Sequence, residues 1–241
     1  MTEKQLYDAK RFADIEYNLS VVRERVANAA ALSGRKAEEI QIMAVSKTVE
    51  PVYINHAISL GMNLIGENKV QEYLGKKPDL LPHTAHLIGH LQTNKVKQIV
   101  GEVEMIESVD SVRLAKEIGK RAEAIGKNMK ILAEINVGGE KSKSGIPWDA
   151  AFETIAEISE IVSVELCGLM AIPPVCEKKE DSRAFFSKMM QMFVDIRSKN
   201  IDNTNIRVLS MGMSSDYYEA VLEGSNLVRV GTSIFGGRIY R

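Results

Sequence analysis

The chain has 241 residues, of which 45% are hydrophobic, so it is long enough to bury one large core. Lys and Arg total 31 against 32 Asp and Glu, which gives a formal net charge of −1 and excludes a strong overall field for nucleic acid or an anionic membrane. Two cysteines exclude a disulfide scaffold, and the charged N-terminus and short apolar runs argue against secretion or a membrane span, so we expect a cytoplasmic protein.

A helix is the first element that the sequence predicts. Ile15, Leu19, Val22 and Val26 are separated by four, three and four residues, which places them on one face of a helix. Gly34 follows this stripe, and a glycine at that position favours the end of a helix. Because the first strand pattern comes later, this helix is an addition to the fold that follows.

Eight short β-rich runs come next, with amphipathic stretches between them. The runs lie at about residues 41–48, 63–68, 86–91, 105–109, 130–137, 164–171, 207–213 and 227–236. Apolar strands that alternate with helices favour a parallel sheet covered on its outer face by helices. Eight such units in about 200 residues predict an α/β fold, a TIM-type (β/α)8 barrel, with an open doubly wound sheet as the alternative. No linker divides residues 1–241, so we expect a single domain.

Several helices between these strands have a predicted boundary or face. Pro51 suits the first turn of one helix, and Asp110 or Ser111 suits the N-cap of another. The apolar face of that second helix consists of Ala115, Ile118, Ala122 and Ile125. Further helices are predicted at about 148–161, at about 185–196, and after a cap at Ser214, Ser215 or Asp216.

Polar side chains and glycines gather where the predicted strands end. In parallel α/β folds the carboxyl ends of the strands meet at one edge, and ligands bind there. The residues at these ends are Ser46, Lys47, Thr48, Glu67, Asn68, His86, Gly89, His90, Asn136, Met170, Ser210, Gly212, Ser214, Arg229, Gly231 and Thr232. We therefore expect the functional site at the carboxyl-terminal mouth of the barrel.

Lys47 is the most informative of these residues. It follows the apolar run 42–45, so its surroundings are expected to be the barrel interior. Burial disfavours an ammonium and lowers the pKa of a lysine, and the neutral amine is the form that attacks a carbonyl carbon. Lys47 is therefore a candidate for imine formation. The alternative is a lysine that merely meets water or a carboxylate at the strand end.

Two segments near the C-terminus suit a phosphate group. SMGMSSD (residues 210–216) precedes a predicted helix, whose backbone N–H groups and positive dipole end attract an anion. GTSIFGG (residues 231–237) follows the eighth predicted strand, and barrels frequently bind phosphate in the loops after strands seven and eight. Either segment alone is an ordinary Gly/Ser turn, but their joint position favours a bound phosphate.

A closed barrel brings its first and eighth strands together, so Lys47 is expected beside these phosphate segments. A ligand with an aldehyde and a phosphate on one rigid ring would span them, and pyridoxal 5′-phosphate (PLP) is such a ligand. Arg229, two residues before Gly231, is then expected to face the ring nitrogen. Arginine stays protonated and donates to an unprotonated nitrogen, which weakens the ring as an electron sink. The alternative for Arg229 is a salt bridge at the barrel rim.

Longer segments add a resemblance to a known family. They are AVSKT, IGENKVQE, HLIGHLQTNKVK, SVDS, INVGGEKSKSGI, GLMAIPP, VLSMGMSSDYYEAV and VRVGTSIFG, from about residue 43 to 238. In this order they resemble the pyridoxal-phosphate homeostasis protein family, single-domain relatives of the alanine racemase N-terminal barrel. His90 is a variation, since many relatives have proline there.

The resemblance implies a set of cofactor-binding residues. It makes Lys47 the Schiff-base lysine and Arg229 the arginine near the pyridine nitrogen. Five residues fall in the segments that surround the phosphate: Ser210, Gly212, Ser214, Gly231 and Thr232. Three more, Asn68, His86 and Met170, fall on segments that line the cofactor mouth. The resemblance implies neither catalytic residues nor metal ligands.

The resemblance also implies a carrier or regulator of intracellular PLP (vitamin B6) rather than an enzyme. Racemisation needs a proton removed from one face and returned on the other. In alanine racemases the second base is a tyrosine of an additional β-domain, and we expect this chain to lack that domain because the eighth strand lies close to Arg241. The alternatives are a weak or specialised PLP-dependent racemase and a phosphate-binding barrel without an aldehyde ligand.

Partners and secondary sites follow from the same reasoning. We expect PLP itself and PLP-dependent apo-enzymes as recipients, and a monomer, because the racemase dimer contacts involve the β-domain. Lys141 and Lys143 suggest a second anion site, against the simpler interpretation of a solvated loop. His83, His86 and His90 lack an accompanying carboxylate pattern, so we expect no metal site.

Overall fold

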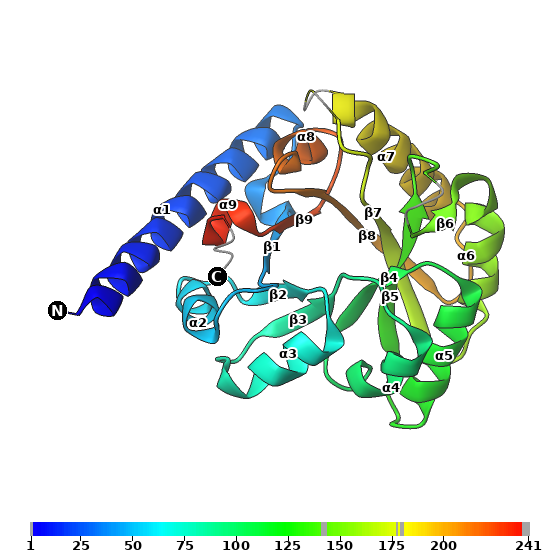
Figure 1. Cartoon of the computed structure of the whole chain (residues 1–241). Coiled ribbons are helices and arrows are strands. Elements are labelled where there is room, and N and C mark those ends of the chain that lie inside the picture. Colours follow the sequence, from blue (N-terminus) through cyan, green and yellow to red (C-terminus); the bar gives the residue numbers. More distant parts are fainter. Residues whose placement is uncertain (1, 141–143, 177, 179–180, 238–241) are drawn as a thin grey trace.

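Eight parallel strands close into a barrel in the computed structural model, which describes residues 2–140, 144–176, 178 and 181–237 (Figure 1). The strands are β1 (Gln41–Val45), β2 (Leu64–Glu67), β3 (Thr84–Leu87), β4 (Met105–Val109), β5 (Met129–Asn136), β7 (Val164–Ala171), β8 (Thr204–Met213) and β9 (Leu227–Val230). They pair in this order, and β9 pairs in parallel with β1. This closure confirms the predicted TIM-type barrel over the open sheet. A two-residue strand, β6 (Ile146–Pro147), pairs with β5 outside the ring.

Helices surround the barrel on its outside (Figure 1). They are α1 (Glu3–Leu32), α2 (Pro51–Ser59), α3 (Val70–Lys76), α4 (Val96–Ile99), α5 (Val112–Glu123), α6 (Ala151–Ser159), α7 (Ser182–Ser198), α8 (Tyr217–Leu222) and α9 (Thr232–Phe235). Within the described part of the chain, none of them combines the length and the apolar character that a bilayer span requires.

The N-terminal helix α1 is the predicted addition, and it packs against α2, α8 and α9. Its predicted stripe, including Ile15 and Val26, is buried. Thr2 caps its first turn by accepting a hydrogen bond from the Gln5 N–H. Gly34 has a φ of 72°, the left-handed conformation that ends a helix, as predicted.

Alternation along the strands divides the core into two parts. Outward side chains such as Ala44 and Ile65 pack beneath the helices in one large apolar cluster. Inside the barrel, a small apolar cluster is made of Met105, Leu132, Cys167 and Met170. The interior is therefore filled by side chains, and the polar groups that remain inside the ring are buried with it.

Some predicted boundaries are wrong. The third predicted strand ends at Leu87 rather than at residue 91. The eighth predicted strand, β9, ends at Val230 rather than at residue 236, and the short helix α9 begins at Thr232. Gly89 explains the first case. A Cβ there would lie 2.3 Å from the backbone oxygen of Asn68, so the chain at Gly89 passes close to the loop after β2 instead of continuing as a strand. Ile125 lies beyond α5 and is exposed, so it is not part of that helix face.

Candidate cofactor-binding site

A chain of hydrogen bonds crosses the inside of the barrel. His86 Nδ1 on β3 lies 2.7 Å from Glu107 Oε1 on β4. The Ser210 hydroxyl on β8 donates to Glu107 Oε2 at 2.6 Å, and Arg229 Nη1 on β9 donates to the Ser210 hydroxyl oxygen at 2.6 Å. Arg229 Nη2 donates to the Ala171 carbonyl at 3.0 Å. All four side chains are buried, so five strands contribute to one enclosed polar network.

Glu107 is the anion that compensates Arg229. Burial alone raises the pKa of this carboxyl, but the hydrogen bond and charge of His86, together with the charge of Arg229, hold that pKa below its ordinary value. Burial lowers the pKa of Arg229, whereas Glu107 and Glu134 oppose that shift. A guanidinium keeps its proton under such conditions. Arg229 therefore presents fixed N–H donors inside the barrel.

Lys47 lies two residues beyond the end of β1, in the turn that follows it. Met43 is in register with Arg229, whose side chain lies inside the barrel, and alternation carries the same orientation to Val45, the last residue of β1. Lys47 is half-buried. The intervening Ser46 is buried, and its hydroxyl donates to Glu67 at 2.7 Å. The structure thus places Lys47 where it was predicted, at the carboxyl end of the first strand.

The two predicted phosphate segments meet. The Ser214 hydroxyl oxygen accepts hydrogen bonds from the N–H groups of Gly231 at 3.1 Å and Ser233 at 3.2 Å. The Ser233 hydroxyl donates to the Ser214 carbonyl at 3.2 Å. A Cβ at Gly231 would lie 3.3 Å from the Val45 Cβ, so this turn packs directly on the end of β1. Hydroxyls and converging N–H groups therefore stand beside the strand that leads to Lys47.

Ser210 and Gly212, of the predicted phosphate set, have different surroundings, whereas Thr232 adjoins the turn. Ser210 belongs to the buried network with Arg229 and not to the Ser214 turn. Gly212 has a φ of 93°, and a Cβ there would lie 2.5 Å from the Ala220 Cβ, so this glycine lets α8 approach β8. Thr232 is exposed at the first position of α9. Of the set, Ser214, Gly231 and Thr232 are at the turn itself.

The three residues predicted at the mouth also separate by depth. Asn68 follows β2 and is half-buried, and its Oδ1 is buried without a hydrogen-bond partner among the described residues. His86 lies deeper in the barrel, where its ring is hydrogen-bonded to Glu107. Met170 is fully buried in the interior apolar cluster. Asn68 thus offers a polar atom for a ligand, whereas Met170 offers an apolar wall.

Sequence reasoning missed three polar residues of this region. Glu107 is an isolated carboxylate within the apolar run MIESV, and Glu134 stands in the same way within KILAEINV. Glu134 is 5% exposed, accepts from the Ser144 hydroxyl at 3.0 Å, and has a pKa raised by burial. Ser233 supplies an N–H and a hydroxyl to the Ser214 turn. A carboxylate inside a predicted strand was a signal for the first two.

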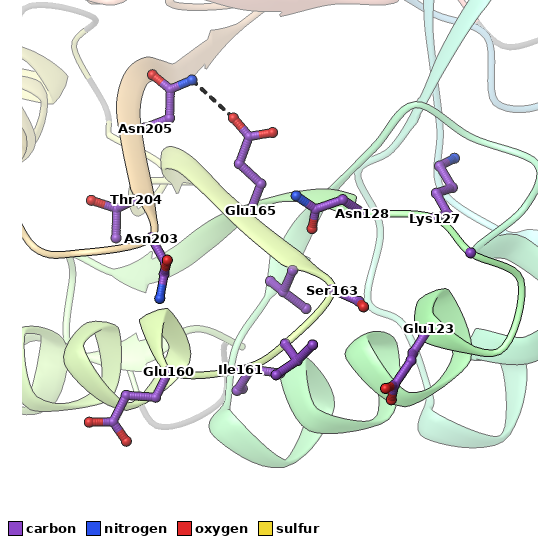
Figure 2. Close-up of a pocket in the computed structure, with 13 residues that line it drawn as sticks. Glu123, Lys127, Asn128, Glu160, Ile161, Ser163, Glu165, Asn203, Thr204 and Asn205 are labelled. Atoms are coloured by element: carbon purple, nitrogen blue, oxygen red, sulfur yellow. Dashed lines mark hydrogen bonds between the residues drawn. The ribbon is translucent and has the colours of Figure 1, made fainter.

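A cavity of about 750 Å³ lies at the opposite, amino-terminal ends of β5, β7 and β8 (Figure 2). Its lining mixes polar and apolar side chains and includes Glu165, which accepts a hydrogen bond from Asn205 at 2.9 Å. None of the predicted site residues lines it. The predicted anion site at Lys141 and Lys143 lies outside the described residues. Among the side chains that the structure does describe, no cluster of three His, Cys, Asp or Glu could hold a metal ion.

The barrel fold defines a class of protein. A family model, alanine racemase N-terminal domain, matches residues 14–239. Within that class, a pyridoxal phosphate homeostasis protein from Aquifex aeolicus is 40% identical over 224 residues, which are 92% of this chain and 97% of that relative. The chain belongs to the pyridoxal phosphate homeostasis protein family.

Solved structures agree with this placement. PipY from Synechococcus elongatus, whose structure has PLP bound, has a TM-score of 0.77 and 31% identity, with 88% of this chain and all (100%) of that chain covered. An alanine racemase from Clostridium difficile has a TM-score of 0.71 at 14% identity, and the match covers 92% of this chain but 56% of the racemase. The racemase likeness extends to the fold alone.

Proposed function

We propose that this chain binds pyridoxal 5′-phosphate and that Lys47 forms a Schiff base with its aldehyde. The observation that carries this proposal is the packing of Gly231 on Val45, which brings the N–H groups of the Ser214 turn beside the end of β1. An aldehyde and a phosphate on one ring match a lysine and an anion-binding turn on neighbouring strands. The relative PipY, whose structure has PLP bound, supports PLP as the ligand.

The residues at the carboxyl ends fit this cofactor. The hydroxyls of Ser214 and Thr232 would hold the phosphate. The N–H groups of Gly231 and Ser233, which donate to the Ser214 hydroxyl oxygen in this structure, would turn to the phosphate with it. Arg229 would donate to the ring nitrogen from inside the barrel, held by the Ser210 hydroxyl and, through Glu107, by His86. Gly212 would support the site by the close approach of α8 to β8. The unpartnered Oδ1 of Asn68 and the apolar side chain of Met170 would contact the ring edge and wall.

Formation of the Schiff base on Lys47 needs no reactant besides the lysine amine and the aldehyde. The neutral Nζ forms a C=N bond with the aldehyde carbon, and the aldehyde oxygen leaves as water. When bound, PLP supplies an electrophilic carbon and a ring that withdraws electrons. Arg229 moderates that withdrawal, because it is always protonated and does not transfer a proton to the ring nitrogen.

We further propose a non-catalytic carrier or regulator of intracellular PLP, with PLP-dependent apo-enzymes as recipients. A racemase needs a second base facing the side away from Lys47. The Tyr218 hydroxyl is instead directed to α1, where it donates to Asn28 Oδ1 at 2.6 Å, and Tyr217 is buried in the outer core. A single-domain, cytoplasmic monomer over residues 1–241 completes this proposal.

Reduction and mass mapping test the proposed linkage. The purified chain is incubated with PLP, its absorption spectrum is recorded, borohydride is added, and the labelled peptide is identified. We expect a pyridoxyl adduct on Lys47 that Lys47→Ala abolishes while its far-ultraviolet circular dichroism is unchanged. Lys77→Ala, which removes an exposed lysine, is the matched control and retains the adduct.

Two outcomes contradict the proposal. A colourless protein, or an adduct on another lysine, removes Lys47 from its assigned role. Solvent deuterium entering Cα of alanine would show turnover and favour the racemase alternative, whereas bound phosphate without any imine absorption would favour the phosphate-binding barrel.

A further inference from the structure

Side chains of α3 hold the two peptide groups that flank Lys47. On the N-terminal side, Lys76 Nζ donates to the Ser46 carbonyl oxygen at 2.9 Å. On the C-terminal side, the Thr48 N–H donates to Glu72 Oε1. The backbone before and after Lys47 is therefore attached to one helix.

All three N–H donors of the Lys76 ammonium have an acceptor in this arrangement. Besides the Ser46 carbonyl, its Nζ contacts Glu72 Oε1 at 2.5 Å and Glu67 Oε1 at 3.2 Å. An ammonium has three N–H donors, and these three acceptors match them. The side chains of Lys76 and Glu67 are largely or fully buried, at 14% and 1% exposure. Charge-assisted hydrogen bonds shielded from water in this way are strong ones.

The two carboxyl groups of this cluster, Glu67 and Glu72, have pKa values shifted in opposite directions. Burial raises the pKa of Glu67, although Lys76 and the Ser46 hydroxyl oppose that shift. Burial also acts to raise the pKa of Glu72, but hydrogen bonds from Lys76 and from the Thr48 N–H hold it below its ordinary value. Glu72 is therefore the ionised acceptor that the Thr48 amide meets.

The backbone needs such support at this point. Thr48 has a φ of 63°, a left-handed conformation that costs free energy for a β-branched residue and persists only where its surroundings impose it. The Ser46 carbonyl also accepts from the Val49 N–H at 3.0 Å, which closes the turn around Lys47. The contacts from α3 secure both sides of that turn.

We infer that Glu72 and Lys76 are positioning residues that set the backbone from which Lys47 reaches PLP. They gather at the end of β1 with the Ser46 hydroxyl and Glu67. They act on the site through these two peptide groups. The inference rests on the proposed role of Lys47.

The test compares Glu72→Ala with Glu72→Gln, whose amide oxygen still accepts from the Thr48 N–H. In the PLP-free protein, amide hydrogen exchange of Thr48 is measured by NMR. In the PLP-treated protein, the PLP concentration that gives half-maximal borohydride-trapped adduct on Lys47 is measured. We expect both quantities to rise about tenfold in Glu72→Ala and to return towards their original values in Glu72→Gln.

Two further variants complete the design. Lys76→Met is expected to reproduce the Glu72→Ala result, and if it fails to fold, the two Glu72 variants decide. Lys77→Met removes the adjacent, exposed ion pair with Glu102 and is expected to change neither quantity.

The outcomes separate this inference from the proposed function. If the unchanged chain forms the adduct on Lys47 and Glu72→Ala forms it at the same PLP concentration, the inference is wrong and the Schiff base stands. If the unchanged chain forms no adduct on Lys47, the proposed function fails and the inference fails with it.

Discussion

Arg229 and Glu107 stand on opposite strands of the barrel and are joined through one hydroxyl group. The ring order places β4 and β9 four strands apart in a ring of eight. Ser210 bridges them, accepting from the Arg229 guanidinium and donating to the Glu107 carboxylate, each at 2.6 Å. The proposed ring-nitrogen partner is thus fixed by a network that spans the whole interior.

Glu107→Gln should destabilise the protein by about 3–5 kcal/mol, because it leaves the buried Arg229 guanidinium without its carboxylate. Urea-induced unfolding measures the difference. Glu102→Gln is the control, since its carboxylate makes an exposed ion pair with Lys77 at 2.7 Å and should cost less than about 1 kcal/mol. Equal losses in the two variants would contradict a compensating role for Glu107.

The same carboxylate should make stability depend on pH. Its pKa in the folded protein is below the ordinary value of 4.5, so the folded state binds fewer protons than the unfolded state in the intervening window. Its contribution is present above that ordinary value and is lost as the pH falls through the folded pKa. The difference in unfolding free energy between the unchanged chain and Glu107→Gln should therefore shrink on acidification. If the difference in unfolding free energy between the two proteins stayed constant down to about pH 3, the lowered pKa of Glu107 would be refuted.

Ser214→Ala should weaken PLP binding about tenfold and leave binding of pyridoxal, which has no phosphate, unchanged. The hydroxyl that is removed accepts hydrogen bonds from the N–H groups of Gly231 and Ser233. Titration followed by absorbance measures both ligands. Ser198→Ala, at an exposed serine of α7, is the control. An equal loss for pyridoxal would place Ser214 away from the phosphate.

Two glycine substitutions should act in opposite directions. Gly212→Ala meets the Ala220 Cβ at 2.5 Å and has an unfavourable φ of 93°, so we expect a loss of about 2–4 kcal/mol. Gly75→Ala, in α3, meets nothing within 4 Å and should gain up to about 1 kcal/mol. Thermal unfolding of both variants checks the contrast, and a stabilised Gly212→Ala would show that α8 does not pack as described.

The two cysteines should differ in reactivity. Burial raises the pKa of the Cys167 thiol to about 11, so at about pH 8 only about one thiol in a thousand is ionised. Cys176 is half-exposed after the Pro-Pro loop. Alkylation followed by peptide mapping should label Cys176 first and Cys167 only after unfolding. Rapid labelling of a native Cys176→Ser variant would contradict this order.

The sequence by itself determined the strands and helices, favoured a closed barrel and predicts a site at one end of it. Apolar runs of strand length that alternate with amphipathic helices specify a parallel barrel, because each element must bury one face against the next. Lys47 after the first run, and the segments containing Ser214 and Gly231 after the last two, then fall at one end. These signals are local, so they left the open sheet as an alternative, which the pairing of β9 with β1 excludes.

The tertiary structure alone decided which groups partner one another. Glu107 meets Arg229, and Lys76 meets the Ser46 carbonyl, because of strand order, barrel register and the path of α3. The burial of a charge and the identity of its counter-charge depend on contacts between residues far apart in the chain. Hydrophobic periodicity carries no information about such pairs, so the sequence predicts where the site lies, whereas the fold determined the electrostatics of the buried groups there.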